Sequence, residues 1–386
     1  MQVVAVRQRL TELDSLRGLA ALVVVTTHFF TLFDRPHVSN FQDLRSLSLL
    51  DQRWPLLLRM SPLGILLQGH SAVVLFFVLS GFVLSLPLMR RAVSPYWPGF
   101  LLRRLVRLYI PYAGALILAS AGYILFSSHG IAALSPWFNR TWSQPFSWPL
   151  FFQHLLFIGE YDVQQINTAF WSLVYEMRVS LLFPIVYIAG SRLGTGVQLW
   201  LGFGLIATGI LLNGKSDPWL PFTVAVAGMF QLGMTTARCF SSLLAWYQLL
   251  SVGKQRLLLV STLLAFAYAV PVTKNLGGGL AGDLLMAPAA VLLIIIAAGN
   301  KRIANQLNHR VLCWLGERSY SLYLMHPTVL FTLVYVTYGR TAEHGFGYWL
   351  LLSILYLGLT VAVTEVFYRA VERPSLGVQR RIPLYR

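Results

Sequence analysis

The sequence predicts an all-α, polytopic bundle of transmembrane helices with about ten spans. Hydrophobic residues make up 56% of the 386 residues and charged residues only 11%, whereas a soluble domain carries about 25% charged residues. The mean hydropathy is +0.63. Uninterrupted apolar runs recur along the chain, and each is long enough to cross a bilayer core, which takes roughly 20 residues. Lipid, not water, is therefore the main solvent of this chain.

Ten segments have the length and composition of membrane spans. They cover, in order, residues 16–33, 71–89, 108–127, 168–189, 197–213, 219–237, 257–273, 280–299, 319–338 and 348–368. A shorter apolar stretch at 149–159 is typical of an interfacial or re-entrant helix. Since no internal repeat is visible, we expect one transmembrane domain over residues 1–375, followed by a short basic cytoplasmic tail over 376–386.

The distribution of basic residues predicts the orientation. Ten spans place both termini on one side of the membrane, and twenty of the 30 Lys and Arg residues fall in segments on that side, against eight in the opposite loops. Because cytoplasmic segments carry the excess of Lys and Arg, we expect both termini in the cytoplasm. The longest loops, 34–70 and 128–167, then lie outside.

Several other functional classes are disfavoured. The net charge of +16 is spread between apolar segments instead of forming one patch, which argues against nucleic-acid binding. Cys239 and Cys313 lack metal-ligand spacing, so we expect no metal. Neither a Walker-type phosphate loop nor a serine-hydrolase elbow is present.

The first span carries two ionisable residues, Arg17 and His28. Eleven residues correspond to three helical turns plus about 20°, so both lie on one face, about 16 Å apart along the axis. Asp14 lies one turn before Arg17 and can pair with it. Arg17 alone could be a snorkelling anchor at the interface. His28 lies beyond the midplane, where an ionisable residue indicates a functional site.

The fourth and ninth spans add further ionisable residues. Glu176 lies about 12 Å from the outer start of its span, at a depth that overlaps that of His28, so a His–Glu pair suited to proton abstraction is allowed. Alternatively, Glu176 neutralises Arg178 or another buried arginine. His326 lies at mid-depth beside the helix-kinking Pro327, where it either packs or contacts substrate.

Three arginines, Arg103, Arg104 and Arg107, lie where the third span meets the cytoplasm. Arg104 and Arg107 are three residues apart and share a helix face, so together they could grip paired phosphates. The alternative is a topological role or the binding of lipid headgroups.

Several segments of the chain, taken in order, resemble the motifs of one known family. The matching segments are ELDSLRGLAALVVVTTHF at 12–29, LFFVLSGFVLS at 75–85, the R-x-x-R of Arg104 and Arg107, FWSLVYEMRVSLLFP at 170–184, LGERSYSLYLMHP at 315–327 and YRAVERP at 368–374. Each is weakly specific, but the ordered set resembles the acyltransferase-3 family of integral membrane O-acyltransferases over nearly the whole chain.

The resemblance implies a multi-pass enzyme of the bacterial cytoplasmic membrane that takes an acyl group, usually acetyl, from cytoplasmic acyl-CoA and passes it to a hydroxyl. Acceptors in the family are mostly glycans or lipid-linked saccharides of the cell envelope, and in a minority of members macrolides or other small molecules. The resemblance implies that His28 and Arg17 are essential, that Glu176 supports them, and that Arg103, Arg104 and Arg107 meet acetyl-CoA. Six further residues are expected to line the substrate site: Asp14, Ser80, Trp171, Arg178, Tyr320 and His326.

The chain also departs from the family pattern. Members often have two carboxylates or Glu-Gln after the W-S-L motif, whereas here Tyr175 precedes Glu176. Some members carry an SGNH hydrolase-like domain beyond the last span, and here we expect a stand-alone protein. Buried Arg, His and Glu residues also form proton relays, so a proton-coupled transporter or flippase is the alternative. His28 could act as a general base or as an acyl carrier, and we favour the base.

Overall fold

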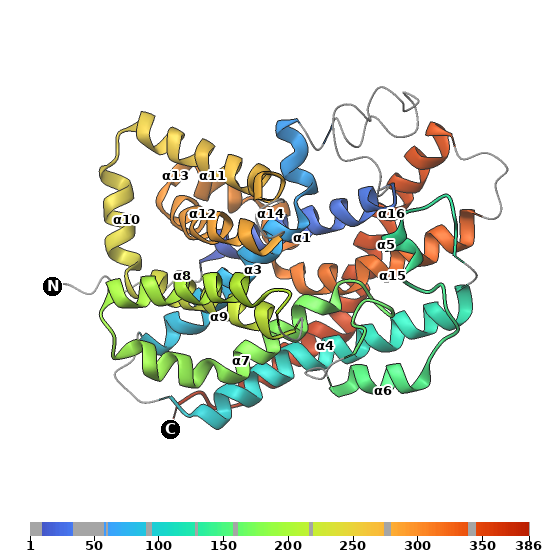
Figure 1. The fold of residues 1–386 in the computed structure, drawn as a ribbon, viewed down its shortest axis with the longest axis horizontal. Helices are drawn as coiled ribbons and strands as arrows, with labels where there is room; N and C mark the ends of the chain where they lie inside the picture. Colours follow the sequence, from blue (N-terminus) through green and yellow to red (C-terminus); the bar gives the residue numbers. More distant parts are fainter. Residues whose placement is uncertain are drawn as a thin grey trace.

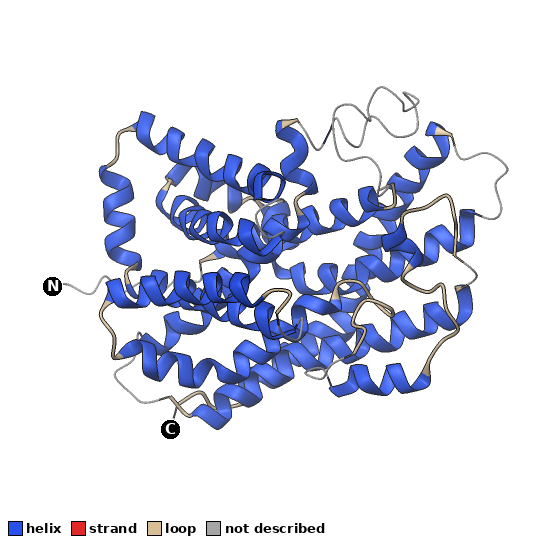
Figure 2. Ribbon diagram, in the orientation of Figure 1, coloured by secondary structure: helices blue, strands red, loops and turns tan. Residues whose placement is uncertain are grey.

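The computed structural model describes residues 10–33, 58, 61–89, 95–127, 130–156, 161–215, 219–273, 279–338 and 345–385. Within these ranges the chain is helical and has no strand, only an isolated bridge between Pro95 and Tyr385 (Figure 2). The prediction of an all-α fold is confirmed. Residues 34–57 and 59–60 of the predicted outer loop lie outside the described residues.

Ten long helices correspond one by one to the ten predicted spans (Figure 1). They are α1 Thr11–Thr31, α3 Gly69–Met89, α4 Trp97–Phe126, α7 Phe170–Ser191, α8 Thr195–Leu212, α9 Trp219–Arg238, α11 Val252–Thr273, α12 Gly279–Gly299, α15 Ser319–Thr337 and α16 Phe346–Phe367. Shorter elements connect them: η2 Pro62–Leu67, α5 Pro136–Asn139, α6 Trp148–Leu156, α10 Phe240–Leu249, α13 Lys301–Leu307, α14 Arg310–Glu317, η5 Tyr368–Glu372 and α17 Arg373–Arg381.

Among the described residues, eight of these helices are long and apolar enough to cross a membrane, so the chain is a multi-pass membrane protein. The two that do not meet that criterion are α11 and α15. Helix α15 is less apolar because it carries Ser319, Ser321 and His326, all of which are buried within the bundle. In α9, 72% of the most apolar window is buried, against 22% in α8, so α9 belongs to the core and α8 to the lipid-facing periphery.

Glycines bring several core helices into direct backbone contact. A Cβ atom on Gly81 of α3 would lie 2.1 Å from the carbonyl oxygen of Phe230 in α9, and one on Gly233 would lie 2.1 Å from that of Val78. Helix α1 approaches α14 in the same way, because a Cβ on Gly18 would lie 2.7 Å from the backbone nitrogen of Gly316. Small residues of this kind allow membrane helices to pack closely.

The two ends of the described chain lie at the same end of the bundle. The hydroxyl of Thr11 donates a hydrogen bond to Asn308, which follows α13 (2.5 Å), and the hydroxyl of Tyr385 donates one to the carbonyl of Pro87 near the end of α3 (2.7 Å). Helix α1 runs antiparallel to α3, so the start of α1 and the end of α3 are level. Figure 1 shows α10 and the C-terminus on this side and α5 on the other. That this end faces the cytoplasm remains a prediction from charge.

The short helix α6 packs alongside α4, close to its middle. The hydroxyl of Tyr109 donates to the carbonyl of Leu155 (2.9 Å), and Nδ1 of His154 lies 3.0 Å from the hydroxyl of Tyr112. His154 is fully buried there. These contacts favour a re-entrant over an interfacial helix. Residues 157–159 of the predicted segment lie outside the described chain.

Candidate active site

A cavity with about 400 Å³ of empty space, part of it open to the outside, lies between α1, α3, α7 and α15, at the level of the predicted charged residues. Four of the residues singled out from the sequence line it: Arg17, Ser80, Glu176 and Tyr320. The apolar wall comes mainly from α3, with Val73, Phe76 and Phe77. The cavity therefore combines a hydrophobic surface with a few converging polar groups, which is the usual composition of a ligand site.

Glu176 is held by an arginine, but not by its neighbour Arg178. One carboxylate oxygen of Glu176 accepts hydrogen bonds from the guanidinium of Arg104 (2.8 Å) and from the hydroxyl of Ser80 (3.0 Å). Arg104 also donates to the hydroxyl of Ser180 (3.0 Å). Both charged side chains are largely buried, at 9% and 13% exposed. The His28–Glu176 pair that the depths allowed is absent, since Glu176 is engaged by Arg104 and Ser80.

Two other arginines carry charge without such pairing: Arg17 lines the cavity, and Arg107 lies within electrostatic range of Arg17. In the described part of the chain, Arg17 makes no hydrogen bond and its Nε atom is buried without a partner. The side chain of Arg107 likewise has no hydrogen bond or ion pair there. Arg107, Arg104, Glu176 and Asp14 all lie within electrostatic range of Arg17. Arg104 is committed to Glu176, whereas the guanidinium groups of Arg17 and Arg107 keep hydrogen-bond donors available for an anionic ligand.

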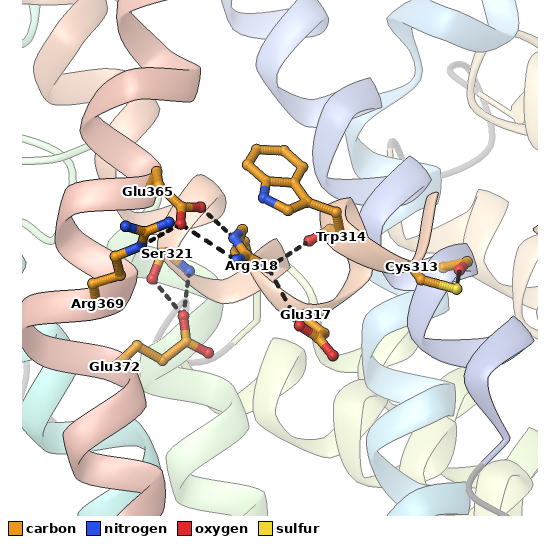
Figure 3. Close-up of polar contacts among 9 residues, drawn as sticks. Cys313, Trp314, Glu317, Arg318, Ser321, Glu365, Arg369 and Glu372 are labelled. Carbon is orange, nitrogen blue, oxygen red and sulfur yellow. Dashed lines mark hydrogen bonds and ion pairs between the residues drawn. The ribbon is translucent and has the colours of Figure 1, made fainter. Parts of the chain in front are cut away.

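The sequence analysis missed Glu372, a buried carboxylate between the last long helix, α16, and α17. Glu372 lies within electrostatic range of Arg107 and Arg17 and accepts hydrogen bonds from the backbone N–H (3.0 Å) and the hydroxyl of Ser321 (Figure 3). It ends a π-helical turn, Tyr368–Glu372, a distortion that is frequent at functional sites. An acidic residue directly after a long apolar span was the available signal.

The same view shows a cluster of ion pairs at the start of α15. Glu365 of α16 accepts hydrogen bonds from Arg318, which precedes α15, and from Arg369 (2.6 Å) (Figure 3). Arg318 also lies 4.6 Å from the ring centroid of Tyr368. These contacts hold the start of α15 against the end of α16, and thereby fix the helix that carries Tyr320 and His326.

His28 pairs with His326, about three turns beyond Arg17 on α1. Nδ1 of His28 lies 2.8 Å from Nε2 of His326, and the two rings stack with centroids 4.9 Å apart. Nδ1 of His326 lies 3.0 Å from the carbonyl oxygen of Leu322, which can only accept. His326 must therefore donate from Nδ1, and its neutral ring accepts at Nε2 from Nδ1–H of His28. This chain of hydrogen bonds leaves the lone pair of His28 on Nε2.

Aromatic side chains enclose the histidine pair. On one side, Trp137 of α5 lies 5.0 Å from His28 between ring centroids. On the other, Tyr323 lines the cavity, lies 5.9 Å from the His326 ring and shares a 2.7 Å hydrogen bond with Ser172. Tyr323 thus connects the charged cavity to the histidine pair. It was not singled out from the sequence, although it lies three residues before His326.

The remaining predicted residues do not line the cavity: Asp14 lies within electrostatic range of Arg17, and Arg103, Arg178 and Trp171 have other contacts. Arg103 donates to the carbonyl of Ile382 (3.0 Å), so it anchors the C-terminal segment and does not join Arg104 and Arg107. Arg178 lies over the ring of Trp219 (5.0 Å) at the start of α9. Trp171 packs on Phe222 of the same helix, with ring centroids 5.4 Å apart.

Within the part of the chain that the structure describes, no group of three or more His, Cys, Asp and Glu side chains could hold a metal ion. Cys239 and Cys313 are free thiols. Arginine, carboxylate and hydroxyl groups line the cavity, and the imidazole groups of His28 and His326 lie beyond it.

Comparison with known proteins identifies the family of this chain. The family model described as an acyltransferase domain, acyltransferase-3, matches residues 10–369. The Bacillus subtilis (strain 168) protein named "Putative peptidoglycan O-acetyltransferase YrhL" is 23% identical over 338 residues, which cover 79% of this chain and 50% of that protein. The chain thus spans about half the length of this relative. No solved structure matches. Because the family match covers nearly the whole chain, the protein belongs to the acyltransferase-3 family.

Proposed function

We propose that this protein is an O-acyltransferase of the bacterial cytoplasmic membrane. It would transfer an acetyl or other short acyl group from cytoplasmic acyl-CoA to a hydroxyl of a cell-envelope or exported glycan. Family membership supports the reaction class, and the name of the Bacillus subtilis relative supports a glycan acceptor. The observation that carries the proposal is the His28–His326 pair, which lies beyond a cavity lined by arginine.

The unpaired arginines are the best candidates for binding the donor. Arg104 is already engaged by Glu176 and Ser180, so its guanidinium has little capacity left for phosphates. The guanidinium groups of Arg17 and Arg107 are available for phosphates and lie within electrostatic range of each other. Their charge suits the phosphates or the developing thiolate of acyl-CoA, and the extended pantetheine arm can then carry the thioester along the cavity toward His28.

His28 is the proposed general base. Its Nε2 takes the proton of the acceptor hydroxyl while that oxygen attacks the thioester carbonyl. The C–S bond then breaks, and the thiolate leaves and recovers the proton from His28 as the thiol of CoA. His326 holds the His28 ring in the tautomer that this step requires, because Nδ1–H of His28 is committed to Nε2 of His326. General bases of this kind contribute about 10²–10⁴-fold in rate.

The experiment is acyl transfer by the His28→Ala variant in vesicles, with acetyl-CoA affinity measured on the same preparation. We expect transfer to fall by at least about 100-fold while the affinity stays unchanged, because His28 contacts the reacting atoms and not the phosphates. His309→Ala, an exposed helix-cap histidine, is the matched control and should retain full transfer.

Two results would change the proposal. Retained transfer in His28→Ala would remove this residue from the mechanism. A radiolabelled acetyl group trapped on the wild-type protein without acceptor, and absent from the variant, would make His28 an acyl carrier instead of a base.

A further inference from the structure

A histidine–aspartate pair, His70–Asp283, lies outside the cavity and has no role in the mechanism above. His70 is the second residue of α3 and Asp283 the fifth of α12, and Nε2 of His70 lies 2.7 Å from a carboxylate oxygen of Asp283. The Asp283 side chain has no exposed surface, whereas the His70 side chain is 25% exposed. A buried carboxylate therefore holds an imidazole that is accessible.

The pair is not a saturated structural contact. The second carboxylate oxygen of Asp283 is buried and has no hydrogen-bond partner within the described chain. Nε2 of His70 is committed to Asp283, so Nδ1 is the ring nitrogen left for a ligand, and no partner for that atom is found among the described residues. Buried polar groups are normally satisfied, so this arrangement indicates a site that a ligand completes.

Helix α3 connects this pair to the cavity. His70 and Phe77 are seven residues apart, so they differ by only about 20° around the helix. Phe77, Val73 and Ser80 line the cavity on the same side of α3. His70 lies about 15 Å along the axis from Ser80. The neighbouring Gly69 packs against Thr27, since a Cβ there would lie 3.1 Å from the Thr27 side chain, so His70 and His28 are at the same level.

The surroundings of His70 suit a neutral, hydroxylated ligand. The ring of Phe222 lies 6.3 Å from that of His70, and Phe222 packs on the half-exposed Trp171. Aromatic faces pack against the apolar side of a sugar ring, while an imidazole lone pair accepts from a hydroxyl. The buried carboxylate of Asp283 would repel phosphates, so the donor is a poor fit here.

On the basis of the proposed function, we infer that His70, oriented by Asp283, binds a hydroxyl group of the glycan acceptor. Phe222 and Trp171 provide the apolar surface beside it. The acceptor then approaches the histidine pair from the end of the bundle opposite to the arginines, and its reacting hydroxyl reaches His28 at the level that Thr27 and Gly69 share.

The test compares acyl transfer to a soluble peptidoglycan fragment of two disaccharide-peptide units. The double variant His70→Leu with Asp283→Leu replaces both partners with apolar groups, which a merely structural pair tolerates. We expect the KM for the fragment to rise about tenfold, as for one lost hydrogen bond, while kcat and acetyl-CoA affinity change little. His309→Ala is the control. An unchanged KM in the folded double variant would overturn the inference.

A second measurement does not depend on transfer. The fragment should slow the modification of His70 by diethylpyrocarbonate in the wild-type protein and leave the modification of His309 unaffected. Equal rates at His70 with and without saturating fragment would overturn the inference. If the wild type failed to transfer acetyl groups at all, the proposed function would fall, and this protection would still decide whether His70 binds the sugar.

Discussion

The arginine end and the histidine end of the site are built on opposite principles. At the arginine end, full charges meet: Arg104 is paired with Glu176, and Arg17 and Arg107 add positive charge. At the histidine end, His28 and His326 form a hydrogen-bonded pair between neutral rings, with no carboxylate among the groups they bond. Fixed charge suits the binding of an anion, whereas an imidazole whose proton can move suits catalysis.

Each end also has a polar group that is left without a partner. Glu176 has two partners and Arg104 has two, so this part of the cluster is preorganised without a ligand. The free Nε of Arg17 and the unpartnered oxygen of Asp283 are at opposite ends of the site. We expect groups whose hydrogen bonds are satisfied to position their neighbours, and groups without partners to bind ligand. This distinction can be tested at both ends.

The largest expected effect concerns which end faces the cytoplasm, since labelling is all-or-none. In a background with Cys239 and Cys313 replaced by Ser, Ala132→Cys should react with an impermeant maleimide on intact cells. Asn305→Cys, at the arginine end, should react only after the membrane is opened. Both positions are exposed, so access to the side chain is not limiting. The reverse labelling would put the histidine end beside the acyl-CoA pool and contradict the assignment of donor binding to the arginine end.

The next effect concerns the saturated ion pair. Glu176→Ala leaves the buried guanidinium of Arg104 uncompensated and should lower the free energy of unfolding by about 3–5 kcal/mol. Replacing both residues, Arg104→Leu with Glu176→Leu, should cost less, because no buried charge is left alone. Chemical denaturation in detergent measures both. Equal losses would mean that the pair does not act as a unit.

The smallest effect sharpens the assignment of the donor site. Arg17→Ala combined with Arg107→Ala should weaken acetyl-CoA binding by at least about tenfold, since charge-assisted phosphate contacts contribute roughly 1.5–3 kcal/mol each. Arg103→Ala removes the same charge from the same helix as Arg107 but only frees the carbonyl of Ile382. It should bind acetyl-CoA normally in isothermal titration. Weaker binding in Arg103→Ala would restore this residue to the donor site.

Local patterns predicted the elements but not their partners. Apolar runs located all ten long helices, and helical geometry correctly placed Arg17 and His28 three turns apart on α1. The rotation of one helix against another is set by packing across the whole chain, and no local pattern contains it. His28 therefore meets His326 across 298 residues, and His70 meets Asp283 across 213.

The same reasoning explains the residues that were assigned differently. Arg103, Arg104 and Arg107 form one basic run in the sequence, but successive residues on a helix point about 100° apart. Arg104 therefore faces Glu176 in α7, whereas Arg103 faces the C-terminal segment. Residues 376–385, expected as a tail, pack on the bundle, because the hydroxyl of Tyr385 donates to the carbonyl of Pro87 and the N–H of Tyr96 donates to the carbonyl of Leu384.

The backbone contact between α3 and α9 limits how the protein can move. Even a methyl group at Gly81 or Gly233 would collide with the opposite main chain, so neither helix can slide past the other without separating first. Helix α3 therefore moves as one rigid element, which keeps Ser80 and His70 at a constant separation. Rocking one half of the bundle against the other, as transporters do, would have to carry α3 and α9 together. Any widening of the cavity would then come from its other walls, formed by α1, α7 and α15.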